Sequence, residues 1–224
     1  MRNLWVVACW IAVPLAGHAA SFDCGKASSA VEKLICGNGK LSELDDHLGR
    51  YYATARAELG AGKSCLAAQQ RAWLKWRNAC NDASCLEQLY LQRLAELDPL
   101  QPGAGALKNV ELPSVKSLVW IIPPAEDQVA APRPKVMTPF TVTGRLLDEV
   151  ANGDGFVIQD SQGGKHPLLL LMFITKSSGV RLETLAHQPD ALYEASGSSE
   201  AAADGSRHFS PGACIMLHRL PASR

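Results

Sequence analysis

The cysteines constrain the fold of this chain more than any other feature. The chain opens with an arginine, an apolar run from Leu4 to about Leu15 and small residues up to Ala20, which is the pattern of a secretory signal peptide over residues 1–20. Six of the seven cysteines follow this leader: Cys24, Cys36, Cys65, Cys80, Cys85 and Cys214. An even number of cysteines in an exported chain favours disulfides over metal or redox sites. We therefore expect a periplasmic or extracellular protein braced by disulfides.

The leader leaves one alternative open. Cys9 lies in the stretch VVAC, which is similar to a lipobox, so lipidation there would anchor the mature protein. A cleaved signal peptide is favoured because little apolar sequence precedes Cys9 and much follows it. The apolar run is too short to span a bilayer, and no later segment is long and apolar enough. We expect no membrane span.

Charge and motifs exclude several classes of function. Lysine and arginine total 22 residues, and aspartate and glutamate also total 22. A nucleic-acid partner normally requires a basic excess, so none is expected. The chain has no GxSxG or HExxH motif, no phosphate-binding glycine-rich loop and no zinc ligand set. We expect no enzyme activity, no catalytic residue, no metal and no cofactor.

Residues 21–98 have helical periodicity. Ser29 and Glu32 form a capping box ahead of a first helix, and leucines from Leu41 to Leu59 recur at helical spacing until GAGK breaks the pattern. A third helix from about Ser64 carries an inner stripe of Leu66, Gln69, Trp73, Trp76 and Cys80. A second capping box, Ser84 with Glu87, predicts the start of a fourth helix with Leu86, Leu89 or Tyr90, Leu94 and Leu97 facing inward. The pattern predicts a disulfide-braced antiparallel helical hairpin with flanking helices.

The rest of the chain divides into a proline-rich segment and a segment with the pattern of β-strands. Residues 99–138 are rich in proline, as in a linker, but the apolar segment 115–122 is expected to lie as a strand or extended segment against a domain. Residues 139–224 show short strands, a hairpin signal NGDG at 152–155 and one helix near 180–188. This predicts a small β-barrel of the oligonucleotide/oligosaccharide-binding (OB) type, with a small open sandwich as the alternative. The fold class is therefore α + β with two domains.

Helix geometry limits the pairing of the cysteines. Cys36 and Cys80 are expected at the same end of the hairpin, whereas joining Cys24 to Cys36 needs the leading segment to fold back almost fully extended. Bonds that cross from the Cys24/Cys36 segment to the Cys80/Cys85 segment are therefore favoured. Cys65 lies about 22 Å along its helix from Cys80, which leaves Cys214 as its partner. The alternative is two free buried thiols.

Three stretches of the helical half resemble a known family: SFDCGKASSAVEKLICGNGKLSELDDHLGRYYA, QQRAWLKWRNAC and CLEQLYLQRLAEL. The positions that carry the resemblance are Phe22, Asp23, Cys24, Ile35, Cys36, Leu44, Asp45, Tyr52, Gln70, Trp73, Arg77, Cys80, Cys85, Leu86, Tyr90 and Arg93. Residues 21–98 are similar to the N-terminal domain of LprI-type lysozyme inhibitors, a domain also found in uncharacterised exported bacterial proteins. The resemblance implies the helical fold and, more weakly, an inhibitor role. Cys65 and the whole C-terminal half depart from the family pattern.

Roles can be assigned to a few side chains of the helical half. Trp73, Leu44, Leu86 and Tyr90 are expected in its core. Arg77 is expected to form a structural ion pair with Asp45 or Asp23, and Trp76 to lie at the rim. An inhibitor of a basic lysozyme should gather acidic residues such as Glu43, Asp45, Asp46 and Glu58 on one face. The candidate partner-binding residues are Glu43, Asp46 and Trp76.

Two functional hypotheses follow. The first is an exported binding protein that occludes a partner enzyme, such as a lysozyme, with its helical surface. The alternative is a cell-envelope interaction module whose β domain binds a glycan, a peptide or an envelope protein, with the helical domain as scaffold.

Overall fold

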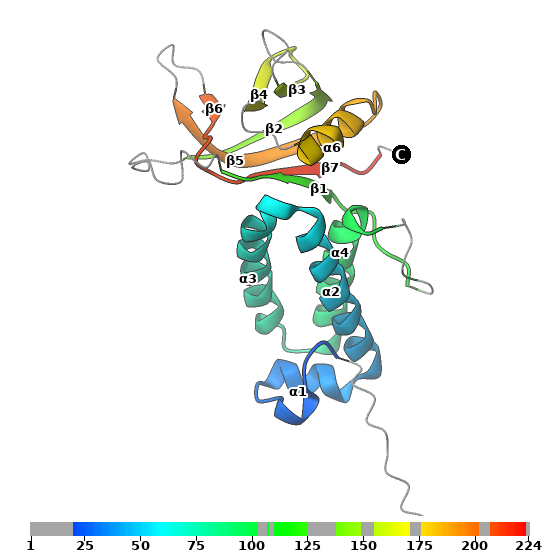
Figure 1. The fold of residues 1–224 in the computed structure, drawn as a ribbon. Coiled ribbons are helices and arrows are strands. Elements are labelled where there is room, and N and C mark those ends of the chain that lie inside the picture. The colour runs from blue at the N-terminus through cyan, green and yellow to red at the C-terminus, as the bar shows by residue number, and fades with distance from the viewer. Residues whose placement is uncertain are drawn as a thin grey trace, which may run out of the picture.

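A computed structural model describes residues 20–102, 107, 110–124, 138–148, 155–170, 176–201 and 207–222. The predicted leader up to residue 19, including Cys9, lies outside the described residues, as does most of the predicted NGDG turn. The chain forms a helical part and an antiparallel sheet, with strand β1 between them (Figure 1).

The helical part consists of α-helices and short 3-10 turns. The α-helices are α1 (Ala30–Gly37), α2 (Gly39–Glu58), α3 (Lys63–Ala79) and α4 (Ala83–Leu97), and the 3-10 turns are η1 (Cys24–Lys26), η2 (Gly60–Gly62) and η3 (Asp98–Leu100). Figure 1 shows α2, α3 and α4 running alongside one another beneath the sheet, with α1 at the end farthest from it. The helical hairpin predicted from periodicity is thus present.

The helix starts show one correct and one wrong capping prediction. Ser29 caps α1: its hydroxyl accepts the N–H of Glu32, and the Glu32 carboxylate accepts the N–H of Ser29, as a capping box requires. The predicted second box at Ser84 is wrong. Asp82 caps α4 instead, because its carboxylate accepts the N–H of Cys85 at 2.9 Å.

The core of the helical part is built around two aromatic rings. Leu44, Trp73, Leu86 and Tyr90 are all buried. Trp73 packs edge-on against Tyr90, with 5.4 Å between ring centroids. Such a pair contributes more than its buried area alone, which suits a helical unit of this small size.

A buried carboxylate ties the N-terminal segment to this core. Asp45 accepts hydrogen bonds from the Tyr90 hydroxyl at 2.6 Å and from the Ser21 backbone N–H at 2.8 Å. Burial and the neighbouring Asp45 carboxylate hold the pKa of Tyr90 above its ordinary value, so its hydroxyl remains a donor. Arg77 lies 3.7 Å from Asp45 as the third group of this cluster, while Asp23 instead accepts the N–H of Gly25.

The sheet is antiparallel throughout its described ladders. Its strands are β1 (Ser117–Ile122), β2 (Thr138–Leu147), β3 (Gly155–Gln159), β4 (Lys165–Leu170), β5 (Tyr193–Ala201), β6 (Arg207–Phe209) and β7 (Ile215–Arg219), with helix α6 (Lys176–Ala186) between β4 and β5. The strand order is β1-β7-β5-β2-β3-β4, and β6 pairs with β5. Within the described ranges, no ladder joins the two end strands β1 and β4.

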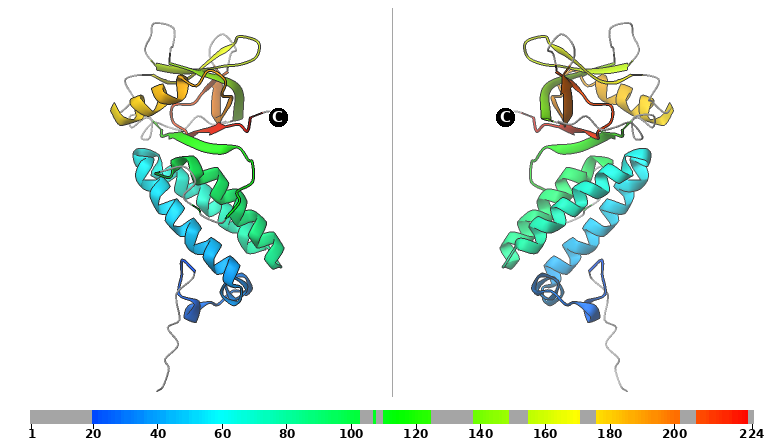
Figure 2. Two further views of the ribbon diagram at one scale, coloured as in Figure 1. Left: turned by 90° about the vertical axis from the view of Figure 1, so that its right-hand side faces the viewer. Right: turned by 90° about the vertical axis from the view of Figure 1, so that its left-hand side faces the viewer.

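The apolar segment of the proline-rich stretch becomes the strand nearest to the helices. β1 pairs antiparallel with β7, and Ile121 lies opposite Met216. Its residues Leu118 to Ile122 are all buried, because β1 is covered by β7 on one side and by the helical part on the other (Figure 2). Gly62, between α2 and α3, lies so close to Ile121 that a Cβ there would stand 3.1 Å from its backbone oxygen.

Cysteine pairing differs from the expectation for the helical part. The described residues hold the disulfides Cys24–Cys36, Cys80–Cys85 and Cys65–Cys214. The predicted bonds between the Cys24/Cys36 segment and the Cys80/Cys85 segment are wrong, because Cys24 bonds to Cys36 and Cys80 bonds to Cys85 within each segment. The η1 turn folds the leading segment back along the short helix α1, and Cys80 leaves α3 in an extended conformation ahead of the new cap at Asp82.

Candidate partner-binding surface

A disulfide and an ion pair connect the helical part to the sheet across the contact between them, which we call the seam. Cys65 of α3 is bonded to Cys214 just ahead of β7. Arg181 of α6 lies 3.3 Å from Glu58 of α2, and its guanidinium also donates to the Pro99 carbonyl. These contacts hold the sheet against the end of the helical hairpin that faces it.

An ion pair lies inside the same seam. Glu96 of α4 contacts Arg93 at 2.6 Å and His218 of β7 at 3.4 Å. Burial alone would raise the pKa of Glu96, but the hydrogen bonds and charges of His218 and Arg93 outweigh it and lower this pKa. Glu96 is therefore a carboxylate that bridges helix and sheet.

A groove of about 440 Å³ opens along this seam. Its lining residues are Gln69, Ala72, Trp73 and Trp76 of α3, Leu89, Gln92, Arg93 and Glu96 of α4, and Val115, Lys116, Ser196, Met216 and His218 from the β1, β5 and β7 region. Trp76 is 65% exposed, the largest exposure among the described large hydrophobic residues. The predicted position of Trp76 at a rim corresponds to the rim of this groove.

Several groove residues carry buried polar atoms without a partner. Within the part of the chain that the structure describes, Gln69 Oε1, Trp73 Nε1, Arg93 Nη2 and His218 Nδ1 form no hydrogen bond. A buried polar group without a partner is costly, and such groups are uncommon in folded proteins. An acceptor that reached Trp73 Nε1 and Arg93 Nη2 would remove part of this cost.

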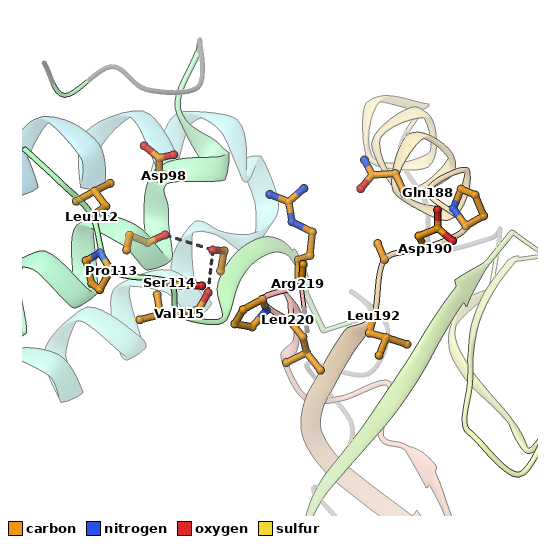
Figure 3. Close-up of a pocket in the computed structure, with 16 residues that line it drawn as sticks. Asp98, Leu112, Pro113, Ser114, Val115, Gln188, Asp190, Leu192, Arg219 and Leu220 are labelled. Atoms are coloured by element: carbon orange, nitrogen blue, oxygen red, sulfur yellow. Dashed lines mark hydrogen bonds between the residues drawn. The ribbon is translucent and has the colours of Figure 1, made fainter. Parts of the chain in front are cut away.

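A second and larger hollow, of about 730 Å³, opens beside the start of β1 and the end of β7 (Figure 3). Arg219, the last residue of β7, points into it between Asp98 of the helical part and Gln188 of the segment after α6. Asp98 already accepts a hydrogen bond from the Tyr51 hydroxyl at 3.0 Å. The hollow thus presents one guanidinium among apolar and acidic groups.

The structure excludes Asp45 from the predicted acidic face. Asp45 is buried in the core cluster, so it contributes no surface charge. Asp46 bonds to Arg50, Glu43 lies 3.5 Å from His47 Nε2, and Glu58 lies in the seam beside Arg181. Each acidic side chain therefore has a basic neighbour on its own or an adjacent element. Charge on α2 does not distinguish a binding surface from an ordinary solvated helix.

The described ranges offer few side-chain groups for chemistry. Within them, no group of three or more histidine, cysteine, aspartate and glutamate side chains could hold a metal ion. His166 and Asp160 form a pair at 2.8 Å inside a turn, where hydrogen bonds from His166 and the Gly164 and Gln162 N–H groups lower the pKa of Asp160. None of the helices of the described part is long and apolar enough for a membrane span.

The helical part of the chain matches a known protein family. Residues 24–97 match the family model described as lysozyme inhibitor LprI. The description of this LprI model names an inhibitor and not an enzyme. The resemblance predicted from the sequence is therefore confirmed for this LprI-type region, residues 24–97. No solved structure matches the chain.

Curated relatives cover the same part of the chain. Lipoprotein LprI of Mycobacterium bovis is 32% identical over 96 residues, which are 41% of this chain and 47% of that protein. Lipoprotein LprI of Mycobacterium tuberculosis has the same identity and coverage. The chain thus spans about half the length of the curated relatives that it matches. The β-sheet half lies outside the matched family model.

The sequence does not predict the groove. It indicates the rim position of Trp76, but Lys116, Met216 and His218 meet α3 only because the sheet docks on the hairpin. The one available signal was the elimination argument that paired Cys65 with Cys214, since that bond places α3 beside β7.

Proposed function

We propose that this protein is an exported binding protein that occludes a partner enzyme, a lysozyme, with the surface of its LprI-type region. The observation that carries this proposal is the match of residues 24–97 to a lysozyme inhibitor family. The exposed Trp76 beside the seam groove supports it, because exposed aromatic rings next to apolar hollows are typical binding anchors.

Rigidity also supports an occluding role. The disulfides Cys24–Cys36 and Cys80–Cys85 brace the hairpin at its far end, and Cys65–Cys214 fastens it to the sheet. A preorganised surface loses less conformational entropy when it binds. The helical part, residues 21–98, is therefore proposed as the binding domain, with residues 99–138 as connector.

Direct binding tests the proposal. The chain without residues 1–19 is immobilised and exposed to a panel of lysozymes and to bacterial envelope extract. Retention of at least one lysozyme with saturable 1:1 binding is expected. Retention of envelope proteins or glycans without any lysozyme would favour the alternative module instead.

That alternative has its own support in the β part. We propose that residues 139–224 form an OB-like barrel, since β2, β3 and β4 are followed by α6 and β5 returns to pair with β2 and β7. The hollow around Arg219 would then be the site for an anionic envelope ligand. Substituting Arg219→Ala should abolish capture of such a ligand and leave lysozyme binding unchanged.

A further inference from the structure

The outer face of α3 is basic. The helix carries Lys63, Arg71, Lys75 and Arg77, and it contains no aspartate or glutamate. Arg71 and Lys75 are exposed, and neither has an ion pair or hydrogen bond with any described residue. The cations of α2 behave differently, since Lys40 pairs with Glu87 and Arg50 with Asp46. Arg71 and Lys75 are thus available to an external partner.

An aromatic side chain adjoins these cations. Arg71 and Lys75 are four residues apart, so they lie on one helical face with about 6 Å between their backbone positions. Trp76 is turned by about 100° from Lys75 and is 65% exposed. Figure 1 shows α3 at one side of the helical part, apart from α2 and α4, and all three side chains are exposed. We call Arg71, Lys75 and Trp76 the α3 triad.

The triad fits the chemistry of a glycoside hydrolase cleft. Such enzymes cleave between two carboxyl groups that stand about 5–10 Å apart and flank a sugar-binding cleft. Arg71 and Lys75 share one helical face, so their long side chains can reach two neighbouring carboxylates, and an indole ring is suited to the apolar face of a sugar subsite. Desolvated charge pairs of this kind also give specificity in protein complexes.

We propose that the α3 triad enters the substrate cleft of the inhibited lysozyme, with Arg71 and Lys75 against its paired carboxylates and Trp76 in an adjacent sugar position. This inference rests on the proposed function. The charge complementary to paired catalytic carboxylates is positive, as on this face of α3. Inhibition is therefore competitive with substrate.

The test compares matched charge reversals. The test variant is Arg71→Glu/Lys75→Glu. The control is Lys33→Glu/Arg207→Glu, which changes the net charge by the same amount. The control cations are also exposed and carry no ion pair with a described residue. Inhibition constants are measured with a soluble oligosaccharide substrate at fixed salt, after circular dichroism and melting curves show that each variant is folded.

The expected result is competitive inhibition by the unmodified chain. It should weaken about 30-fold or more in the α3 reversal and in Trp76→Ala, and stay within about threefold in the control. A lysozyme whose two catalytic carboxyls are replaced by amides should bind the unmodified chain more weakly by about tenfold or more, and should bind both it and the α3 reversal equally. Equal binding of the two chains by the amide variant would show that Arg71 and Lys75 pair directly with the catalytic carboxylates, because a general charge effect would persist without those carboxylates.

Several outcomes overturn the inference without touching the proposed function. They are non-competitive inhibition, full inhibition by the α3 reversal, and equal losses in the reversal and the control. Binding to vesicles that contain phosphatidylglycerol is also measured. If the α3 reversal abolishes vesicle binding but leaves lysozyme inhibition unchanged, Arg71 and Lys75 bind anionic surfaces and not the lysozyme. If the unmodified chain inhibits no lysozyme, the proposed function itself fails.

Discussion

Cys65 and Cys214 are joined by a disulfide with 6.1 Å between their Cα atoms, although 149 residues separate them in the chain. The bond fixes the helical hairpin against β7 and so forms the groove that Trp76 borders. Binding surfaces that combine both parts depend on this link.

The first prediction compares this link with the local pair Cys80–Cys85. In the chain-entropy description, closing a loop of 149 residues stabilises by about 5 kcal/mol and closing one of 5 residues by about 2 kcal/mol. Urea unfolding of Cys65→Ser/Cys214→Ser should therefore show a larger loss than that of Cys80→Ser/Cys85→Ser.

A cleavage experiment checks the same link directly. A specific protease site placed within residues 125–137 allows the chain to be cut between the two parts. The fragments should migrate together without reductant and separate with it. Separation without reductant would contradict the bond between the helical part and the sheet.

The second prediction concerns Asp45. Replacing it with asparagine removes an acceptor from the hydrogen bonds of Ser21 and Tyr90 inside the core. We expect Asp45→Asn to lower the free energy of unfolding by about 2–3 kcal/mol, as for hydrogen bonds to a buried charge. The exposed Asp46→Asn should change it by less than about 0.5 kcal/mol. Equal losses for the two variants, measured by urea denaturation, would refute the role of Asp45.

The third prediction is a pH dependence. Hydrogen bonds from the Ser29 and Ser28 N–H groups lower the pKa of Glu32 from 4.5 to about 2. A lowered folded-state pKa means that the charge of Glu32 stabilises the fold above pH about 4.5 and loses this effect as the pH falls toward 2. The melting temperature of Glu32→Gln should lie below that of the unmodified chain at pH 7, with the difference vanishing near pH 2.

A matched substitution isolates the capping box in that experiment. Glu183 is exposed on α6 and has no side-chain bond to a described residue, so Glu183→Gln removes a carboxylate without touching a cap. Its difference from the unmodified chain should stay small at every pH. A difference for Glu32→Gln that persists unchanged at pH 2 would show that its charge is not the cause.

The fourth prediction separates the two tryptophans. Trp73 is 6% exposed and packs on Tyr90, so Trp73→Ala should cost about 3–5 kcal/mol of stability. Trp76 is 65% exposed, so Trp76→Ala should cost less than about 1 kcal/mol while weakening partner binding. Small and equal stability losses in both variants would place Trp73 at the surface instead.

Local features of the helical part were largely predictable. The Ser29 capping box and the buried Trp73 follow from spacing alone, because neighbours one helical turn apart decide both. The wrong cap at Ser84 has a local cause as well. Asp82 reaches the Cys85 N–H from an extended backbone, and the spacing of Ser84 and Glu87 says nothing about that competitor.

Features set by tertiary packing were not predictable. Whether Cys24 can bond to Cys36 depends on how η1 turns the chain back, and the periodicity of the helices contains no information on that turn. The groove arises because β1 and β7 dock beside α3, so its lining comes from segments that are distant in the chain. Trp76 was predictable as a rim residue of the inner stripe, but the sheet residues that it faces across the groove were not.

Lysis inhibition tests the central claim most directly. Bacterial cells are cleared by a lysozyme in the presence of increasing amounts of the chain without residues 1–19, with its disulfides intact, for several lysozyme types. The account predicts that clearing slows in a saturable way at micromolar concentrations or below and that added salt weakens the effect, since opposite charges meet in the complex. Unchanged clearing rates at micromolar excess against every lysozyme tested would contradict it.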